Sequence, residues 1–412
     1  MNKIAKLGLL LLTIILSFGL LSCTEEPIVG DTFTVTFYDK FADVPVLKTI
    51  SCTVGTPCDI EPPAEPSNKD NAYFTRWSVW ESEYYTLNSD TTIIPIYTYD
   101  NVLVSIGSRD IVFYSFFIML GIMAALFLGL REAKRTGIDT DALMDGFLWI
   151  VPVAILGARL WYVAFELDQF LVQGDFFASI LKILGFQRGE LNFADFGLSG
   201  LAIHGAFFVA IICAYFFTKK RKIDLLKLLD IVAVGFILAQ AFGRWGNFFN
   251  QEAHGGLIPG ATLEAQYNYL RYTLGIPEFV ANNMYLAAGT NGFDVTPVTG
   301  YYHPTFYYES MINLIGFGVM LVLRRIKTIR FGELMSLYLI WYGANRIFIE
   351  SMRTDPLTYE LFGLTLKTAT TTSVLMILGG IGLSLLIRLK LKGAAYSTVK
   401  GCIDFSKKGP TE

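Results

Sequence analysis

The sequence predicts an all-α polytopic membrane protein with a small β-rich domain at its N-terminus. Of its 412 residues, 53% are apolar and 17% are charged, whereas an average soluble protein is about 25% charged. The mean hydropathy of +0.47 is positive over the whole chain. Several long segments have almost no charge, and each could cross a bilayer about 30 Å thick. The net charge of −3 is too small to indicate a nucleic-acid partner.

The first 23 residues have the pattern of a bacterial secretion signal. Lys3 and Lys6 precede an uncharged run from Leu7 to Ser22, which is short for a membrane span and suits a signal peptide. The run ends in Leu20-Leu21-Ser22-Cys23, which resembles the lipobox of lipoprotein signal peptides. We therefore expect residues 1–22 to be a lipoprotein-type signal peptide and Cys23 to be a lipidation site. The alternative is an uncleaved signal anchor with an incidental cysteine.

Residues 23–105 differ in composition from the rest of the chain and predict a β-rich module outside the cytoplasm. Apolar and polar residues alternate from Thr32 to Tyr38, and Thr91 to Tyr97 is a further strand candidate. The pattern is similar to the small β-grasp-like repeat modules of bacterial cell surfaces. Cys52 and Cys58 lie in this segment, either as a disulfide, which is allowed outside the cytoplasm, or as two unpaired thiols.

Seven segments that follow the signal are long and apolar enough to be membrane spans. Each carries at most two charged or histidine side chains. The predicted spans are residues 111–130, 146–165, 196–218, 228–249, 304–323, 334–349 and 371–387.

The charge of the loops between these spans predicts their orientation. Lys and Arg gather in residues 131–140, 219–222, 324–330 and 388–392, and the alternate loops are poorer in them. The positive-inside rule places these basic segments in the cytoplasm. Seven spans then put the N-terminus outside, in agreement with the signal peptide. We expect a membrane domain over residues 106–392 and a cytoplasmic tail over residues 393–412.

A few charged and polar side chains lie toward the outer halves of the spans, where exposure to lipid would be costly. Arg244 and Asn247 are three residues apart, and Arg346 and Glu350 are four apart, so each pair shares one helix face. Two arginines beside carboxylates suit a phospholipid head group, because a guanidinium group binds phosphate bidentately. The alternative is a set of interhelical salt bridges and arginines that extend to the membrane surface.

At these residues the sequence resembles the prolipoprotein diacylglyceryl transferases, a family of seven-span bacterial membrane enzymes. The segment from Gly243 to Gly255 fills every fixed position of the family signature Gly-Arg-x-Gly-Asn-Phe-x-Asn-x-Glu-x-x-Gly. Tyr114 matches a first-span tyrosine of the family, although Ser115 follows it where glycine is usual. The resemblance covers about residues 106–392, in which the loop 256–302 is longer than typical. Further matching elements are His204-Gly205, His303 to Glu309, Arg346 with Glu350, and Gly157 to Val163, which contains Arg159.

The resemblance implies a reaction of phosphatidylglycerol with a prolipoprotein. The diacylglyceryl group passes to the thiol of a lipobox cysteine in the signal peptide, and glycerol 1-phosphate is released. This is the first step of bacterial lipoprotein maturation, which takes place in the plasma membrane. The sequence contains no metal-binding cluster or nucleotide loop, so we expect no cofactor.

The resemblance and the chemistry together assign roles to individual residues. A thiol has a reference pKa near 8.5 and needs a base at neutral pH. The catalytic candidates are His204 as this base, with a purely structural His204 as the alternative, and Arg244 and Arg346 for the phosphate. The candidates for binding phosphatidylglycerol are Arg244, Asn247, Glu252, Glu350, Tyr114, His303, Glu309 and Arg159.

Two other functions compete with this interpretation. Intramembrane charges also line transport paths, so a transporter or lipid flippase is one alternative. The sequence shows no pair of similar halves, which disfavours it. The second alternative is a lipid-anchored binding protein in which residues 23–105 carry the binding function and the spans only hold it in the membrane.

Overall fold

The computed structural model resolves the chain into two compact units, Met1–Asp100 and Asn101–Glu412. The predicted signal peptide and Cys23 lie outside the residues that the structure describes. The described residues are 30–39, 46–67, 72–99, 101–107, 109–172, 175–186, 202–286, 289–291, 294–296, 298–353, 358–361, 364–391, 394–399 and 402.

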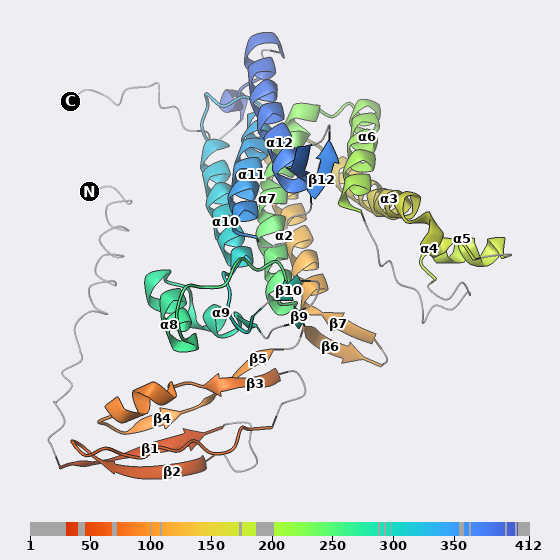
Figure 1. Ribbon diagram of the computed structural model, residues 1–412. Coiled ribbons are helices and arrows are strands. Elements are labelled where there is room, and N and C mark those ends of the chain that lie inside the picture. The colour runs from red at the N-terminus through yellow and green to blue at the C-terminus, as the bar shows by residue number, and fades with distance from the viewer. Residues whose placement is uncertain are drawn as a thin grey trace, which may run out of the picture. The chain divides into compact units, whose positions relative to one another are not determined.

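The first unit is rich in β-structure (Figure 1). Its described elements are β1 (Thr32–Tyr38), β2 (Val46–Thr53), β3 (Ala72–Trp77), η1 (Glu81–Thr86), β4 (Thr91–Ile93) and β5 (Pro95–Tyr99). One sheet has the order β2-β1-β4, in which β1 is antiparallel to β2 and parallel to β4, and β3 pairs separately with β5. In β1 every second residue is buried, because successive side chains of a strand point to opposite faces.

The core of this unit forms around Phe37 of β1, which is fully buried. Its ring packs edge-on against Trp77 and Tyr84, with centroids 5.0 and 6.2 Å apart. Burial raises the pKa of Tyr84 to about 12. Cys52 and Cys58 form a disulfide with their Cα atoms 5.6 Å apart.

The second unit begins with a β-hairpin that leads directly into a bundle of long helices. The hairpin consists of β6 (Val102–Ile106) and β7 (Arg109–Val112). The long helices are α2 (Phe113–Thr136), α3 (Thr140–Phe165), α6 (Ile203–Arg221), α7 (Leu225–Phe249), α10 (Thr305–Leu323), α11 (Glu333–Met352) and α12 (Thr368–Leu386).

Shorter elements connect the long helices. The predicted long loop 256–302 contains short helices and strand pairs, in which β8 pairs with β11 and β9 with β10. These connecting elements are α4 (Leu167–Phe170), α5 (Phe176–Leu184), α8 (Leu263–Asn268), η3 (Tyr269–Thr273), α9 (Glu278–Asn282), β8 (Tyr285–Leu286), β9 (Gly289–Asn291), β10 (Asp294–Thr296), β11 (Gly300–Tyr301), β12 (Thr358–Leu361), β13 (Leu364–Lys367), η4 (Ile387–Leu391) and η5 (Tyr396–Thr398).

Helix α7 lies at the centre of the bundle and packs against α2, α10 and α11 (Figure 1). The contact with α2 is close, since a Cβ atom on Gly121 would lie 3.0 Å from the backbone of Ala239. Helix α3 packs against α6, and α11 packs against α12. Residues near the ends of α7 are therefore held against three neighbouring helices at once.

Helix boundaries follow from local capping chemistry. The side chain of Asp139 accepts hydrogen bonds from the first amides of α3, and the side chain of Asp224 does the same for α7. Helix α2 ends at Gly137, whose left-handed backbone suits glycine. The basic residues predicted for the loops 131–140 and 219–222 thus lie mostly in the last turns of α2 and α6, and only short turns lead from there into α3 and α7.

Within the described residues, five helical segments are long and apolar enough to cross a membrane: α2, α3, α7, α10 and Thr368–Leu391. Large apolar side chains of α2, such as Met119, Met123 and Phe127, face outward, and this suits contact with lipid. The predicted polytopic membrane class is confirmed. The other two predicted spans correspond to α6 and α11, which both carry charged residues, and seven spans remain a prediction.

Candidate active site

One buried carboxylate joins three helices of the bundle near one end of α7. Glu309 of α10 accepts a hydrogen bond from Arg244 of α7, with Nη2 and Oε1 2.7 Å apart. The other oxygen of Glu309 lies 3.8 Å from Nη1 of Arg346 on α11. Nη2 of Arg346 also pairs with Oε2 of Glu350 at 3.0 Å, one turn further along α11. The predicted Arg346–Glu350 pair therefore meets Arg244 through Glu309.

The arginines and the carboxylate differ in their exposure. The side chains of Arg244 and Arg346 are 22% and 20% exposed, whereas that of Glu309 is 1% exposed. A buried carboxylate is stable only when it is paired and hydrogen-bonded. Glu309 thus orients the two guanidinium groups, and each arginine side chain remains partly exposed to a ligand.

The turn after α7 adds amide and carboxylate groups beside Arg244. Oδ1 of Asn247 accepts from Arg244 at 3.3 Å, and Nδ2 of Asn247 donates to Glu252 at 2.8 Å. Asn250 also donates to Glu252, at 3.1 Å. The structure therefore connects Arg244, Asn247 and Glu252 in one hydrogen-bonded chain.

Backbone strain accompanies the placement of Glu252. Its neighbours Gln251 and Ala253 have φ values of 52° and 55°, which lie in the left-handed region that side chains disfavour. The hydroxyl of Thr305 at the start of α10 donates to the carbonyl of Ala253. Strain of this kind gathers at sites where a side chain must be held in a particular place.

Two tyrosines lie beside the arginines. The ring of Tyr114 on α2 packs against Gly246, where an added Cβ atom would lie 2.5 Å from the ring. The hydroxyl of Tyr342 on α11 is hydrogen-bonded to Arg244. Tyr342 was not among the predicted site residues, although it precedes Arg346 by one helical turn. That spacing was the signal available in the sequence.

His303 and His254 belong to the loop network before α10. Nδ1 of His303 lies 3.2 Å from the Tyr308 hydroxyl, and its carbonyl accepts from the amide of Gly255 at 2.8 Å. Burial lowers the pKa of the His303 imidazole below its usual value. The His254 ring is buried against Tyr302. These contacts join the signature segment after α7 to the start of α10.

Arg159 lies in a different place from the arginine pair. On α3 it donates to the carbonyls of Ile183 and Lys182 at 3.0 and 2.9 Å and lies over the Phe170 ring. It therefore holds the last turn of α5 against α3. The remaining catalytic candidate, His204, is the second residue of α6, and its side chain lies outside the description that the structure provides.

Further polar pairs lie deeper in the bundle, toward its middle. The amide of Asn345 donates to Asn313 at 3.1 Å, and Gln240 donates to the Tyr338 hydroxyl at 2.9 Å. Asn345 adjoins Arg346, Asn313 and Gln240 lie about one turn from Glu309 and Arg244, and Tyr338 lies about two turns from Arg346. Across the described residues, no group of three or more His, Cys, Asp or Glu is arranged to hold a metal ion.

The fold and the site define a multi-pass membrane protein with a carboxylate-backed arginine pair at one end of its helical bundle. The sequence profile of the prolipoprotein diacylglyceryl transferases matches residues 101–386. A phosphatidylglycerol–prolipoprotein diacylglyceryl transferase of Listeria innocua is 39% identical over 297 residues, which are 72% of this chain and 93% of that protein. Proteins of the same name from Halalkalibacterium halodurans and Streptococcus sanguinis are each 38% identical, over 68% and 71% of this chain and 84% and 97% of their own lengths. The chain belongs to the prolipoprotein diacylglyceryl transferase family.

Replacing Glu309 by glutamine tests whether its charge holds the site together. Because the change leaves two guanidinium groups without their shared counter-ion, we expect unfolding free energy to fall by about 3 kcal/mol. Thermal unfolding in detergent should show a midpoint several degrees lower. The control is Glu278→Gln, which removes an exposed partner of Arg271 and should cost at most about 1 kcal/mol. Equal midpoints for the two variants would contradict the assignment.

Proposed function

We propose that this chain transfers the diacylglyceryl group of phosphatidylglycerol to the thiol of a lipobox cysteine in prolipoproteins. The relatives with 38–39% identity carry the name of that enzyme. The reaction breaks the bond between the phosphate oxygen and the diacylglyceryl carbon. A thioether forms at the same carbon, and glycerol 1-phosphate leaves with the bonding electron pair.

The observation that supports the proposal is the partly exposed pair of Arg244 and Arg346, whose guanidinium groups meet on the buried Glu309. The phosphate of the lipid gains negative charge as it leaves, and groups that already point toward it stabilise that charge without rearranging. Glu309 holds Arg244 and Arg346 in place. The 3.8 Å contact of Arg346 with Glu309 is the looser of the two, and the shorter contact of Arg346 is its 3.0 Å pair with Glu350.

The neighbouring side chains suit the rest of the head group. Glycerol hydroxyls both donate and accept hydrogen bonds, and Asn247 and Glu252 offer matching amide and carboxylate groups. Glu350 orients Arg346 through their 3.0 Å pair. Tyr114, packed on Gly246, is placed to border the lipid.

Arg159 and His303 are weaker candidates for lipid contact. The guanidinium group of Arg159 is engaged by carbonyls of α5, and the imidazole of His303 by Tyr308. We propose that both act by shaping the site from its border.

The thiol must lose its proton, and we propose His204 as the base that accepts it. Neutral imidazole is the side chain best suited to accept a proton near pH 7. His204 opens α6, which packs against α3.

The alternative function, a transporter or flippase, is not supported. The family profile and the named relatives are transferases. Lipid enters the transferase mechanism as a reactant and needs no path across the bundle.

We further propose a topology of seven spans in the bacterial plasma membrane, with residues 23–105 outside the cytoplasm and the tail after residue 392 inside. The alternation of basic loops supports this orientation. The family match begins at residue 101, and we propose that the catalytic function does not depend on the β-rich unit.

Arg244→Ala should lower thioether formation by about 100-fold or more, because the variant loses a donor to the leaving phosphate. Purified enzyme in detergent would receive phosphatidylglycerol and a lipobox peptide, with the lipopeptide measured by mass spectrometry. Arg221→Ala, which removes a half-exposed arginine paired with Asp145, is the matched control and should retain its rate. Unchanged product formation by Arg244→Ala would remove this residue from the mechanism.

His204→Asn should lose activity near neutral pH and regain it as the pH rises. The reason is that the thiol, with a reference pKa near 8.5, then ionises without a base. The measurement is the rate of thioether formation against pH, compared with the unaltered enzyme. A variant that is fully active at every pH would exclude a base at this position.

The mature N-terminus should be a diacylglyceryl-modified Cys23, with residues 1–22 removed. Mass spectrometry of the N-terminal peptide from the native membrane checks this directly. An intact Met1 or Asn2 terminus would show an uncleaved anchor instead.

A further inference from the structure

Helices α7 and α11, which carry Arg244 and Arg346, are also hydrogen-bonded to each other near their N-terminal ends. Arg244 follows Asp230 by 14 residues on α7, and Arg346 follows Gly332 by 14 residues on α11. Both stretches span about 21 Å at 1.5 Å per residue. Asp230 and Gly332 are hydrogen-bonded to one another, and Arg244 and Arg346 both reach Glu309. The two helices therefore run in the same direction, and they are connected at two points that are separated by the same number of residues on each helix.

The bond at the start of α11 is an unusual helix cap, because its carboxylate comes from another helix. Oδ2 of Asp230 accepts from the amide of Gly332 at 2.9 Å, and Oδ1 accepts from the amide of Met335 at 3.1 Å. Gly332 itself has no side chain with which to cap α11 and has a left-handed φ of 95°. The first amides of a helix need an external acceptor, and here α7 supplies it.

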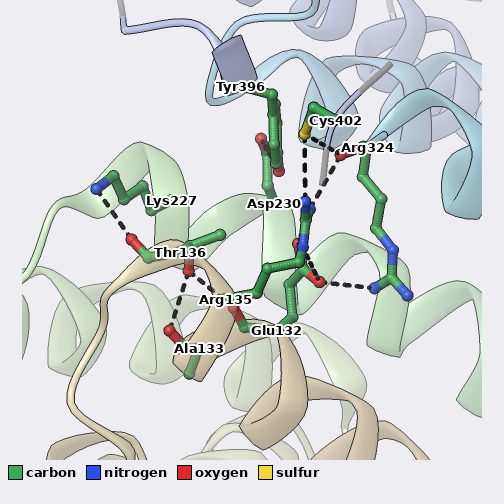
Figure 2. Close-up of polar contacts among 9 residues, drawn as sticks. All are labelled: Glu132, Ala133, Arg135, Thr136, Lys227, Asp230, Arg324, Tyr396 and Cys402. Atoms are coloured by element: carbon green, nitrogen blue, oxygen red, sulfur yellow. Dashed lines mark hydrogen bonds and ion pairs between the residues drawn. The ribbon is translucent and has the colours of Figure 1, made fainter. Parts of the chain in front are cut away.

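The C-terminal segment closes over this carboxylate. The hydroxyl of Tyr396 donates to Oδ2 of Asp230 at 3.1 Å, and both residues are 1% exposed. The Tyr396 amide donates to the carbonyl of Ile329 at 2.8 Å, and its ring lies 4.4 Å from that of Phe331. Figure 2 shows Tyr396 and Asp230 beside a charged group formed by Glu132, Arg135 and Arg324, in which the Arg135 guanidinium lies over the Tyr396 ring, 5.6 Å from its centroid.

We propose that Asp230 is a positioning residue for the transferase reaction, which sets the height of α11 against α7 and so lets Arg244 and Arg346 meet on Glu309. The inference rests on the proposed function. Asp230 acts through the helix and touches neither lipid nor thiol. Since α11 is a stiff rod, a shift at Gly332 carries along its length to Arg346. A misplacement of about 1 Å at a reacting group can cost about 100-fold in rate.

Asparagine is an informative replacement because it preserves the volume and removes one acceptor. The two oxygens of Asp230 serve different amides of α11, and an asparagine side chain has only one oxygen. Its amide group would face a backbone N–H that can only donate. Asp230→Asn therefore removes one of the two hydrogen bonds that the Asp230 carboxylate accepts from α11.

The test is a double-mutant cycle with Arg346→Ala, measured as the rate of thioether formation per folded enzyme. Folded enzyme is counted from the monodisperse peak in detergent. In the unaltered background we expect Asp230→Asn to lower kcat by about 10-fold or more. In the Arg346→Ala background the same change should cost less than about 2-fold, because the group it positions is absent. Equal losses in both backgrounds, or no loss in the first, would overturn the proposal.

Glu132→Gln is the matched control for loss of a buried carboxylate in the same region. Glu132 of α2 pairs with Arg135 and Arg324 (Figure 2), whereas the Gly332 and Met335 amides at the start of α11 donate to Asp230. This variant should unfold at a lower temperature and keep its rate per folded enzyme. A rate loss equal to that of Asp230→Asn would show a general effect of destabilisation and overturn the proposal.

Two further measurements distinguish the possible outcomes. If Asp230→Asn gives no folded enzyme, the cycle is run with Tyr396→Phe, which removes the tyrosine bond to the carboxylate. Its smaller loss should likewise disappear without Arg346, and a loss that persists would overturn the proposal. Thioether formation by the unaltered enzyme tests the proposed function separately. If the unaltered enzyme forms no thioether, the proposed reaction is refuted, whereas the contact of Asp230 with α11 is not.

Discussion

The charge of Glu309 is the constraint on which the helical bundle depends. A carboxylate that is almost completely buried is stable only with partners, and its partners come from two other helices. Helices α7, α10 and α11 must therefore keep fixed relative heights. The same requirement leaves the arginines aligned and partly open. Stability and the proposed readiness for a phosphate are two consequences of one arrangement.

Other parts of the structure support this arrangement from both ends. Beside the arginines, Trp245 and Phe248 of α7 pack against Phe306 of α10, and the strained turn after α7 holds Glu252. At the opposite end, Asp230 ties α7 to α11. Helix positions that are fixed at two separated points leave little freedom to slide or tilt.

Features that depend on residues close in the chain could be predicted. Apolar stretches with few charged residues mark five of the helical segments, because the requirement to cross a bilayer is met within about 20 residues. The alternation of Thr32–Tyr38 follows from strand geometry, and the Arg346–Glu350 pair follows from helical spacing. Tyr342 precedes Arg346 by one helical turn, but it was missed because other aromatic residues such as Trp341 stand in the same span and this spacing alone did not single it out.

The sequence by itself determined the membrane class, the family and the residue types of the site, since each is encoded in short stretches. Only the tertiary structure decided which of these residues meet. Arg159 and Arg244 look alike as lone charges in apolar spans, yet one binds carbonyls of α5 and the other binds Glu309. Asp230 reaches Gly332 across 102 residues of chain. Such pairings depend on the relative heights of packed helices, and these are set by contacts that no local pattern contains.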